Sequence, residues 1–545
     1  MVRKIVSLSL ALMLCLALIP AGAETTLSEL GTYPLVPAGS AELSIFAALP
    51  GGMESYNGNI TTEYIEKNTG VHINWQEVSN AEAGTSFTMS IASGEYPDIY
   101  FQHISGPELL QYAEDGVIIP LNDLIENHSY YLKKLLDENP DVKAAITAPD
   151  GNIYSFPKIQ CSMKQSAPNK MWVYKEWLER YMKETGSEKP QTPEELEKML
   201  LFFRDNDMNG NGDPNDEIVM TGQANYGHDG GNPIYYLLNA FCLTPSFYGF
   251  FYFDENNNWV TNVLSDECRE GLRYCNRLYE EGLIAEEAFV QELTTFRNTT
   301  STTHDKVLVA TAAAPYPFRL LTMHPEIEDS VTWEDYELLL PLKGKDGTAV
   351  TAARREDGID TNCVITTACE NPELAMRWMD FFYTDEMREF ELYGGEEGIG
   401  WEWQDGKNLA GGDRCVVSLM DATTRSQIWS PDWSGTTWTT REMVTAFSAE
   451  NAKEDALSIQ CAIAYEPYTV DEQIPIVYWC NDADAATEFV ELKTLINDYI
   501  TTSLNEFTLG IRDIDSDADW DAYVNEVKNM GMDRYVELAR TYYGK

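Results

Sequence analysis

The N-terminal part of the chain alternates between apolar runs and amphipathic segments. The pattern predicts three strands, over residues 42–48, 71–78 and 97–101. It predicts helices between them, over residues 61–68 and 86–93. In the second strand, Val71, Ile73 and Trp75 alternate with polar residues. Strands that alternate with helices form a parallel sheet covered on both faces, so this region is predicted to be an α/β lobe.

The ends of these strands are the first candidates for a binding site. Ligands of open α/β sheets bind just outside the carboxyl ends of the strands. In this chain those ends point to Pro50, Gln102 and His103. Apolar runs continue the lobe as far as residues 152–157, which are predicted to form the strand by which the chain leaves it.

Two helices with clear boundary signals follow. The first is predicted to end at Gly186. The second begins with Thr192 as its N-cap and Pro193 as its first residue, and Glu195 is predicted to complete a capping box. Their apolar faces consist of Trp177, Leu178, Tyr181 and Met182 in the first helix, and Leu196, Met199, Leu200 and Phe203 in the second.

An acidic loop follows the second helix. Residues 205–217 read Asp-Asn-Asp-Met-Asn-Gly-Asn-Gly-Asp-Pro-Asn-Asp-Glu, so oxygen-bearing side chains alternate with glycines. Calcium takes about six to eight oxygen ligands, and such a loop can supply them. The run therefore predicts a structural calcium ion at a helix end. A solvated Asx turn is the alternative explanation, because Asn, Asp and Gly favour turns in any case.

Two alignments with a calcium loop are open. In the first, the ligands start at Asp205 and continue through Asp207, Asn209, Asp213 and Asp216. In the second, they are Asp207, Asn209, Asn211, the Asp213 carbonyl, and either Asp216 or Glu217, because Ile218 at the twelfth position cannot bind a metal.

The later sequence returns to strand and helix. Residues 306–313 predict a short buried strand, which we expect to complete the first lobe late in the sequence. Asn371 caps a strong helix that starts at Pro372, and the helical C-terminus is broken at Gly531. The chain is predicted to begin with a signal peptide (1–23) and a linker (24–40) and to end with C-terminal helices (501–545). Lobe 1 is predicted to consist of residues 41–160 and 301–360, and lobe 2 of residues 161–300 and 361–500.

Residues 1–23 predict a secretory signal peptide. Arg3 and Lys4 precede an apolar run, and cleavage is expected after Ala23. We therefore expect the mature chain in the periplasm or the extracellular cell envelope. Lipid anchoring at Cys15 is the alternative, but Leu14 stands where a lipidation site has a small residue.

Charge narrows the range of partners. The chain has 38 Lys and Arg against 88 Asp and Glu, a net charge of −50, and removing Arg3 and Lys4 with the signal peptide makes it −52. Such a charge repels nucleic acid, so nucleic-acid binding is excluded. The hydrophobic content of 44% is nonetheless that of a folded protein, so the acidity is predicted to be a solvated surface.

The cysteines predict neither a disulfide framework nor a zinc site. Ten occur in the chain, and nine remain once Cys15 is removed with the signal peptide. They form no CxxC pairs. We expect mostly buried thiols, with one bridge at most.

A family resemblance spans nearly the whole mature chain. Its motifs occur in order at residues 93–98, 171–178, 192–195, 207–217 and 393–401. In this order they resemble the extracellular solute-binding protein family 1, and in particular the large members that serve oligosaccharide ABC importers, including alginate-oligosaccharide-binding proteins. The resemblance implies an α/β, two-lobed type II periplasmic-binding-protein fold that closes around its ligand. It also implies a monomer.

The resemblance further implies that the loop holds Ca²⁺ in the second alignment. The implied ligands are Asp207, Asn209, Asn211, Asp213 through its carbonyl, and Asp216 or Glu217. The spacing between Asn211 and the acidic pair is one residue longer than in some relatives, so the closing ligand stays open.

Sugars present hydroxyl edges and apolar faces, so a sugar site needs aromatic platforms beside carboxylates and amides. Core packing is the alternative role of every aromatic residue. The predicted ligand-binding residues are Gln102, Trp172, Tyr226, Tyr316, Trp401, Glu402, Trp403, Trp433 and Trp438.

These observations predict a secreted, non-catalytic receptor that captures an oligosaccharide and delivers it to a membrane ABC permease. A secreted glycosidase is the alternative, because two carboxylates near aromatic platforms can hydrolyse a glycosidic bond. The chain has no HExxH, GxSxG or P-loop pattern. A ligand-sensing accessory of a membrane receptor is a third hypothesis.

Overall fold

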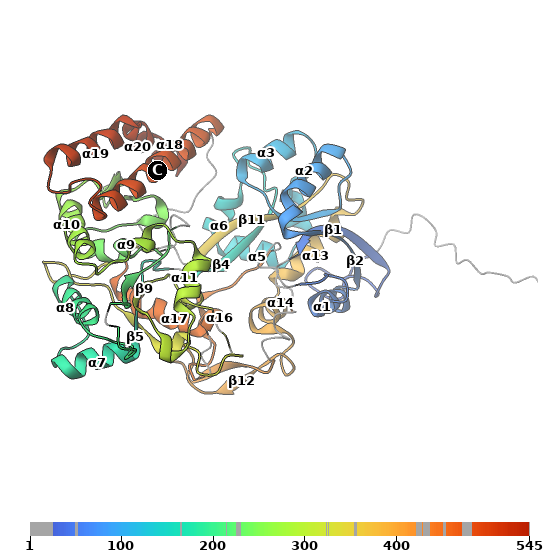
Figure 1. Cartoon of the computed structure of the whole chain (residues 1–545). Helices are drawn as coiled ribbons and strands as arrows, with labels where there is room; N and C mark the ends of the chain where they lie inside the picture. Colours follow the sequence, from blue (N-terminus) through green and yellow to red (C-terminus); the bar gives the residue numbers. More distant parts are fainter. Residues whose placement is uncertain are drawn as a thin grey trace, which may run out of the picture.

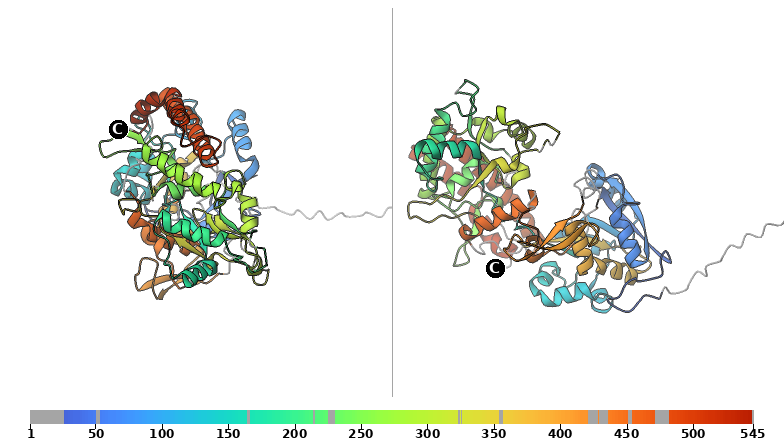
Figure 2. Two further views of the ribbon diagram at one scale, coloured as in Figure 1. Left: turned by 60° about the vertical axis from the view of Figure 1, so that its left-hand side comes forward. Right: turned by 90° about the horizontal axis from the view of Figure 1, so that it is seen from below.

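The computed structural model describes residues 26–49, 53–163, 166–213, 215–224, 230–322, 324, 326–353, 357–420, 428, 436–450, 454–470 and 482–543. The predicted signal peptide lies outside these residues. The described chain folds into two α/β lobes (Figure 1), and Figure 2 shows them joined by a narrow waist.

Lobe 1 is built on a five-stranded sheet of order β2-β1-β3-β11-β4. Its strands are β1 (Ala41–Leu49), β2 (Val71–Ser79), β3 (Ile99–His103), β4 (Phe156–Cys161) and β11 (Asp357–Ile365). β1 runs parallel to β2 and β3, whereas β11 runs antiparallel to β3 and β4. Ile45 and Ala47 of the central β1 have no exposed surface, which explains the apolar run in the sequence.

Helices cover both faces of this sheet. They are α1 (Ile60–Thr69), α2 (Ala83–Ser93), α3 (Gly106–Glu114), α4 (Asn122–His128), α5 (Tyr131–Glu138), α6 (Pro140–Ile146), α13 (Pro372–Asp380) and α14 (Asp385–Glu389). α1 starts where Asn59 Oδ1 accepts a hydrogen bond from Thr61 N at 2.9 Å. It ends at Gly70, whose φ of 78° and close approach to Val36 O admit no side chain.

Lobe 2 has a four-stranded sheet of order β10-β5-β9-β6. Its strands are β5 (Met171–Tyr174), β6 (Ile218–Thr221), β9 (Val309–Ala313) and β10 (Tyr336–Leu339). A separate small hairpin consists of β7 (Phe251–Phe253) and β8 (Trp259–Thr261). β6 and β9 are parallel, and β5 is antiparallel to both β9 and β10.

The helices of lobe 2 share one large core with its sheet. They are α7 (Lys175–Thr185), α8 (Pro193–Arg204), α9 (Pro233–Leu238), α10 (Asp266–Glu280), α11 (Leu293–Thr300), α12 (Pro317–Leu320), α17 (Glu454–Tyr465), α18 (Ala483–Thr508), α19 (Asp517–Asn529) and α20 (Met532–Tyr542). The C-terminal helices belong to this lobe, because Phe489 of α18 and Tyr535 of α20 lie in the same core. Figure 1 shows α18 to α20 on its upper face.

The predicted helix signals are confirmed, with one difference. Thr192 Oγ1 caps α8 by accepting from Glu195 N at 3.3 Å, and Asn371 Oδ1 caps α13. The carboxylate of Glu195 accepts from the backbone N of Gln191 at 2.9 Å. The predicted capping box therefore closes one residue earlier than its pattern implies.

The predicted lobe boundaries are wrong after residue 300. The predicted strand over 306–313 forms as β9, but it pairs with β5 and β6 and so belongs to lobe 2. The predicted boundary at residue 360 divides β11 and places α13 in lobe 2, whereas both elements complete lobe 1. Strand pairing between segments distant in the sequence decided these memberships, and local pattern carries no information on it.

A third region lies at the waist. It contains the hairpin of β12 (Trp401–Asp405) and β13 (Arg414–Ser418), and α16 (Arg441–Thr445). A small core there joins the end of β4 to α17, through Cys161, Val444 and Ile459. The chain passes from β4 to β5 and returns from β10 to β11, so this region is the hinge.

Two general properties concern the described part of the chain. No helix there is long and apolar enough to cross a membrane. The eight cysteines that the structure describes are all buried. The prediction of buried thiols is confirmed for these residues.

Candidate functional site

One edge of the lobe 2 sheet faces lobe 1. β6 and β9 are parallel and end together, and β5 begins at the same edge because Met171 pairs with Ala313. β10 also ends there, where Leu339 pairs with Met171. The chain enters β5 from lobe 1 and leaves β10 toward it, so this edge is turned to the other lobe.

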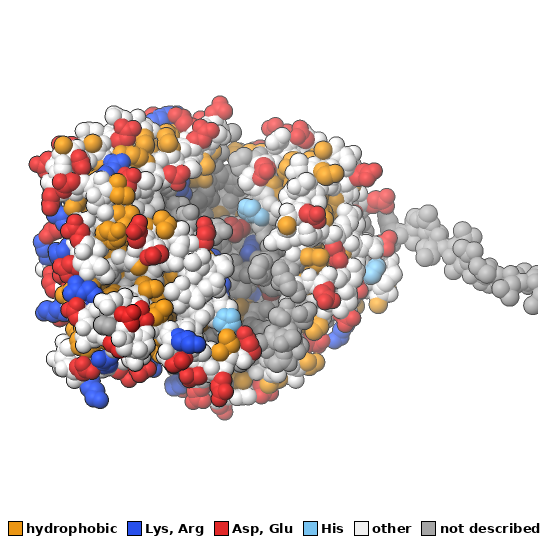
Figure 3. All heavy atoms as spheres, viewed as in Figure 1, with side chains coloured by type: hydrophobic (Ala, Val, Ile, Leu, Met, Phe, Trp, Pro, Cys, Tyr) orange, Lys and Arg blue, Asp and Glu red, His pale blue; other side chains and the backbone are white. Residues whose placement is uncertain are grey.

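The matching edge of lobe 1 faces back. β1 and β3 end at Leu49 and His103, and β4 ends at Cys161, opposite the first residue of β11. In the space-filling view the surface is hollowed between the two lobes (Figure 3). Strand ends that meet across a hinge are where ligands of such sheets bind, so these edges define the candidate site.

The lobe 1 edge carries polar side chains with local partners. His103 is exposed, and its Nδ1 lies 3.2 Å from Asn362 Oδ1 of β11. The neighbouring Gln102 is partly exposed, and its Nε2 donates to the His103 carbonyl at 3.4 Å. Both side chains therefore stay solvated at the end of β3.

The lobe 2 edge contains a residue that sequence analysis missed. Gln223 follows β6 and is only 1% exposed, yet neither amide atom of its side chain has a hydrogen-bond partner. A Cβ on Gly231 would lie 2.4 Å from Gln223 Cγ, so the glycine makes room for this side chain. A buried unpaired amide is costly, and such groups are retained where a ligand supplies the partners. The available signal was a glutamine directly after a buried strand.

A buried lysine supports the same edge. Lys170 precedes β5 and has no exposed surface; its Nζ donates to the Ala167 carbonyl and lies 5.4 Å from the ring centre of Tyr465. Burial lowers the pKa of Lys170 to about 8. Tyr465 Oη donates in turn to the Leu339 carbonyl at 2.5 Å, which ties α17 to the end of β10.

Two of the predicted ligand-binding residues fill cores instead. Trp172 is 1% exposed within β5, and its Nε1 donates to the Ala314 carbonyl at 2.8 Å. Trp401 of β12 is equally enclosed and donates to the Gly395 carbonyl at 2.8 Å. Neither ring has a free face for a sugar, because each ring is enclosed by the protein and each indole N–H already donates to a backbone carbonyl.

The neighbours of Trp401 are more open. Trp403 is partly exposed, and the guanidinium of Arg414 lies over its ring at 4.5 Å. Glu402 is also partly exposed and accepts from Gln404 Nε2 at 2.7 Å. Both lie on the waist hairpin rather than at a strand end of either lobe.

Tyr316 lies at the lobe 2 edge, just beyond β9. It is the N-cap residue of α12, and its Oη accepts from Arg319 Nε at 3.2 Å. The side chain is buried, with 9% of its surface exposed.

Trp438 lies beside β4, where it bridges to Ile159. It is partly exposed, and the guanidinium of Arg388 stacks over its ring at 4.0 Å. Burial lowers the pKa of Arg388 from its ordinary value. The predicted residues Tyr226 and Trp433 lie outside the described residues.

In the acidic loop, the backbone favours the second alignment. Asp205 ends α8 and accepts from Arg204 Nε at 2.8 Å. The two carboxylate oxygens of Asp207 accept from Gly210 N at 2.7 Å and Gly212 N at 2.9 Å. Gly212 has a φ of 95°, which a glycine adopts without strain. A loop that wraps around Asp207 starts its donor set at that residue.

Asp216 and Glu217, the acidic pair at the end of the loop, accept hydrogen bonds from other residues of the loop. The Asn209 and Asn211 amides donate to the two carboxylate oxygens of Asp216, at 3.3 and 2.5 Å. Glu217 Oε1 accepts from Met208 N at 2.6 Å, whereas its Oε2 is buried without a partner. A buried carboxylate oxygen that lacks a donor is suited to a cation.

Among the residues that the structure describes, those of the acidic loop included, no three His, Cys, Asp or Glu side chains are grouped closely enough to hold a metal ion. The donors of the acidic loop are a mixture of carboxylates and amides, which is the composition that calcium prefers.

Two hinged α/β lobes with facing strand ends are the fold of periplasmic-type solute-binding proteins. Residues 47–238 match the model of the bacterial extracellular solute-binding protein family.

Known relatives match a larger part of the chain. The chain is 30% identical over 367 residues to the fructooligosaccharide ABC transporter substrate-binding protein FusA of Streptococcus pneumoniae, which covers 65% of this chain and 62% of FusA. The structure of FusA in complex with kestose aligns over 92% of this chain and 99% of that chain, with 25% identity and a TM-score of 0.71. An EF-hand mutant of FusA in complex with fructo-nystose aligns over the same shares with a TM-score of 0.70 and 25% identity.

Two further relatives are more distant. The HMO-binding solute-binding protein of Bifidobacterium longum infantis shares the fold, with a TM-score of 0.72 over 93% of this chain and 99% of that chain at 17% identity. Lipoprotein LipO of Bacillus subtilis is 22% identical over 228 residues, or 42% of each chain.

Proposed function

We propose that this chain is the extracytoplasmic solute-binding subunit of an ABC importer, and that it captures an oligosaccharide between its lobes. The observation that carries the proposal is the pair of strand-end edges facing each other across the hinge, one of which holds the unpaired amide of Gln223. The protein is a receptor without catalytic chemistry, as its relatives are substrate-binding proteins.

The mechanism follows from the two edges. A ligand that contacts Gln102 and His103 of lobe 1 and Gln223 of lobe 2 stabilises the closed state by its higher affinity for that state. Rotation about the waist brings the edges together, and a membrane permease recognises the closed form. Sugar hydroxyls both donate and accept, so they match the amide and imidazole groups at these positions.

Fructooligosaccharides are the first ligand class to test, because FusA binds kestose and is similar over most of this chain. Isothermal titration calorimetry should compare kestose and nystose with milk and alginate oligosaccharides. Saturable binding of one class supports the proposal. Tight binding of a peptide with no glycan binding overturns it.

Incubation separates the receptor from the glycosidase hypothesis. A receptor returns its bound oligosaccharide unchanged, whereas a hydrolase releases shorter sugars. Chromatography of the glycan after prolonged incubation with the purified chain makes the distinction.

We further propose that the acidic loop holds Ca²⁺ as a structural ion. Asp207, Asn209, Asn211, the Asp213 carbonyl, Asp216 and Glu217 would hold it. The unpaired Glu217 Oε2 and the turn around Asp207 support this assignment, and so does an EF-hand in the related FusA. An ion there would fix the exit of α8 relative to β6.

The proposed location is outside the cytoplasmic membrane. The relatives include an ABC transporter substrate-binding protein and a lipoprotein, both of which fit a function at the cell envelope. The proposed partner is an ABC permease. Fractionation of cells that express the full chain, with and without the Cys15→Ala change, would separate a free from an anchored protein.

A further inference from the structure

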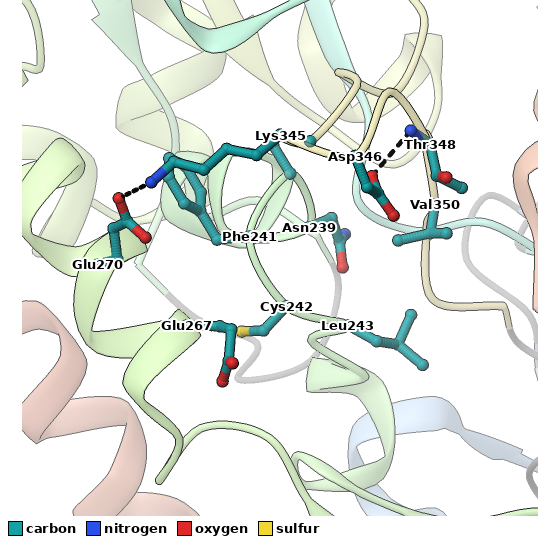
Figure 4. A pocket seen from close by; sticks show the side chains of 12 residues that line it. Asn239, Phe241, Cys242, Leu243, Glu267, Glu270, Lys345, Asp346, Thr348 and Val350 are labelled. Carbon is teal, nitrogen blue, oxygen red and sulfur yellow. Dashed lines mark hydrogen bonds and ion pairs between the residues drawn. The ribbon is translucent and has the colours of Figure 1, made fainter.

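Lobe 2 carries a cavity that the interlobe site does not use. It has a volume of about 300 Å³ and lies between α9, the start of α10 and the loop over residues 344–350. Figure 4 shows its lining side chains. The loop lies close against the end of α9, because a Cβ on Gly344 would be 2.6 Å from the Ala240 carbonyl. The same loop is tied to the start of α8, where Lys343 N donates to the Gln191 carbonyl at 2.7 Å.

A buried amide with an unused donor lies in this cavity. Asn239 is 4% exposed, and its Oδ1 accepts from Thr244 N at 2.9 Å. Its Nδ2 is buried and has no hydrogen-bond partner. The side chain lies among the cavity-lining residues in Figure 4. An N–H donor buried without a partner costs free energy, so this group is suited to a ligand acceptor.

The rim of the cavity is acidic. Glu267, Glu270 and Asp346 contribute carboxylates, and Lys345 is the one cation among the lining residues. Lys345 forms an ion pair with Glu270, and Asp346 Oδ1 accepts from Thr348 N at 2.9 Å. The lining therefore carries a net charge of −2 and offers mainly acceptors at the rim.

These groups restrict the ligand. An anion would suit Asn239 but would be repelled by the three carboxylates. A simple ammonium ion would suit the rim but cannot accept from Asn239 Nδ2. A hydroxyl group accepts from the amide and donates to a carboxylate, so a neutral polyol meets both needs. Phe241 and Leu243 add apolar surface for its C–H faces.

We propose that this cavity is a second ligand site, for a single hydroxyl-bearing ring such as one hexose unit. Its volume lies at the lower end of ligand pockets, which run from roughly 300 to 1,000 Å³, so it admits one ring and not a chain. The site belongs to lobe 2 alone, so its occupancy does not depend on closure of the lobes or on the proposed transport function.

The test uses free D-fructose, D-glucose and D-galactose with the full-length protein, observed by saturation-transfer NMR. At least one hexose should bind weakly and saturably to the wild type. Asn239→Asp keeps an oxygen for Thr244 N but removes the N–H donor, and Val350→Trp fills the cavity from its rim. Each change should lower the affinity at least tenfold.

Two controls place the hexose. Ile511→Trp places the same side chain at a residue of lobe 2 that is 69% exposed, and it should leave binding unchanged. Gln223→Leu alters only the interlobe edge and should also leave hexose binding unchanged. The proposal is overturned if no hexose binds the wild type. It is equally overturned if Gln223→Leu abolishes the signal while Val350→Trp retains it, because the sugar would then occupy the interlobe site.

Discussion

Two glutamines lie at the carboxyl ends of strands, one in each lobe. Gln102 lies at the carboxyl end of β3 in lobe 1, and Gln223 follows the carboxyl end of β6 in lobe 2. Gln102 is partly exposed and bonds to the neighbouring backbone, whereas Gln223 is buried with its amide unpaired. The same residue type at a strand end is therefore solvated in one lobe and desolvated in the other.

For the proposed interlobe site, the difference predicts distinct tasks for the two lobes. A buried amide is already fixed in place, so hydrogen bonds to it discriminate strongly between ligands that can and cannot make them. An exposed amide exchanges water for ligand at little net gain. We infer that lobe 2 determines specificity and that lobe 1 completes the site on closure. Four predictions test this comparison.

Trp172→Ala tests whether this ring belongs to the core of lobe 2 and not to its binding edge. Because the ring is fully enclosed, its loss should reduce the free energy of unfolding by about 3–5 kcal/mol. Chemical denaturation followed by tryptophan fluorescence and circular dichroism measures this. Trp438→Ala, at the partly exposed ring beside β4, should cost much less. Equal losses would contradict the distinction between core and edge.

Lys170→Met tests the desolvation of the lobe 2 edge. The pKa of Lys170 is lowered from 10.5 to about 8, so the folded state binds this proton more weakly than the unfolded state. The wild type should therefore gain stability as pH rises from about 8 to 10.5, by about 3 kcal/mol.

The methionine variant lacks this gain. It should have the higher Tm at pH 7, and the difference should shrink as pH approaches 10. Scanning calorimetry across this pH range measures it. Lys158→Met, on β4 in lobe 1, is the matched control and should show no such trend. A Tm difference that is independent of pH would contradict the burial of a weakly basic lysine.

Calcium removal tests the loop that follows α8. If the ion binds, a calcium concentration 100-fold above Kd should stabilise the fold by about 2.7 kcal/mol, or roughly 5 °C in Tm. Thermal unfolding with calcium and with a chelator measures the shift. Asp207→Asn should abolish it, and Asp205→Asn should retain it because Asp205 is bound to Arg204. A response that depends on Asp205 would restore the first alignment.

Gln223→Leu tests the comparison most directly. The change removes two hydrogen-bonding atoms at nearly constant volume, so affinity for the oligosaccharide should fall about 10- to 30-fold, or roughly 1.5–2 kcal/mol. Stability without ligand should stay equal or rise, because a buried unpaired amide is removed. Gln102→Leu should lower affinity less. Calorimetry on the wild type and on the two glutamine variants measures these affinities. A loss of stability with unchanged affinity would show that Gln223 is a structural residue.

Much of the fold was predictable where the information is local. The Thr192–Pro193 start of α8 and the Asn371–Pro372 start of α13 were predicted, because a cap and the first turn lie within a few residues of each other. The alternation of β1, α1, β2, α2 and β3 was equally clear. The second calcium-loop alignment came from the family resemblance, and the bonds to Asp207 support it.

Membership of a lobe and exposure of a ring were not local. β9 was recognised as a strand, but its partners β5 and β6 lie more than 80 residues earlier in the sequence. Trp172 and Trp438 are both tryptophans in polar–apolar surroundings, and only packing against other segments encloses one and opens the other. No sequence pattern predicted the unpaired amides of Asn239 and Gln223, because an amide is unpaired only when the folded chain brings no hydrogen-bond partner close to it.

By itself the sequence determined the α/β class, the helix boundaries and the acidic loop, since short-range sterics, hydrogen bonding and hydrophobic period govern them. The tertiary structure alone decided which strands share a sheet, which edges face each other and which polar groups are left without partners. Those outcomes depend on contacts between segments that are distant in the sequence. Whether a polar side chain loses its water depends on these contacts and not on the residue type.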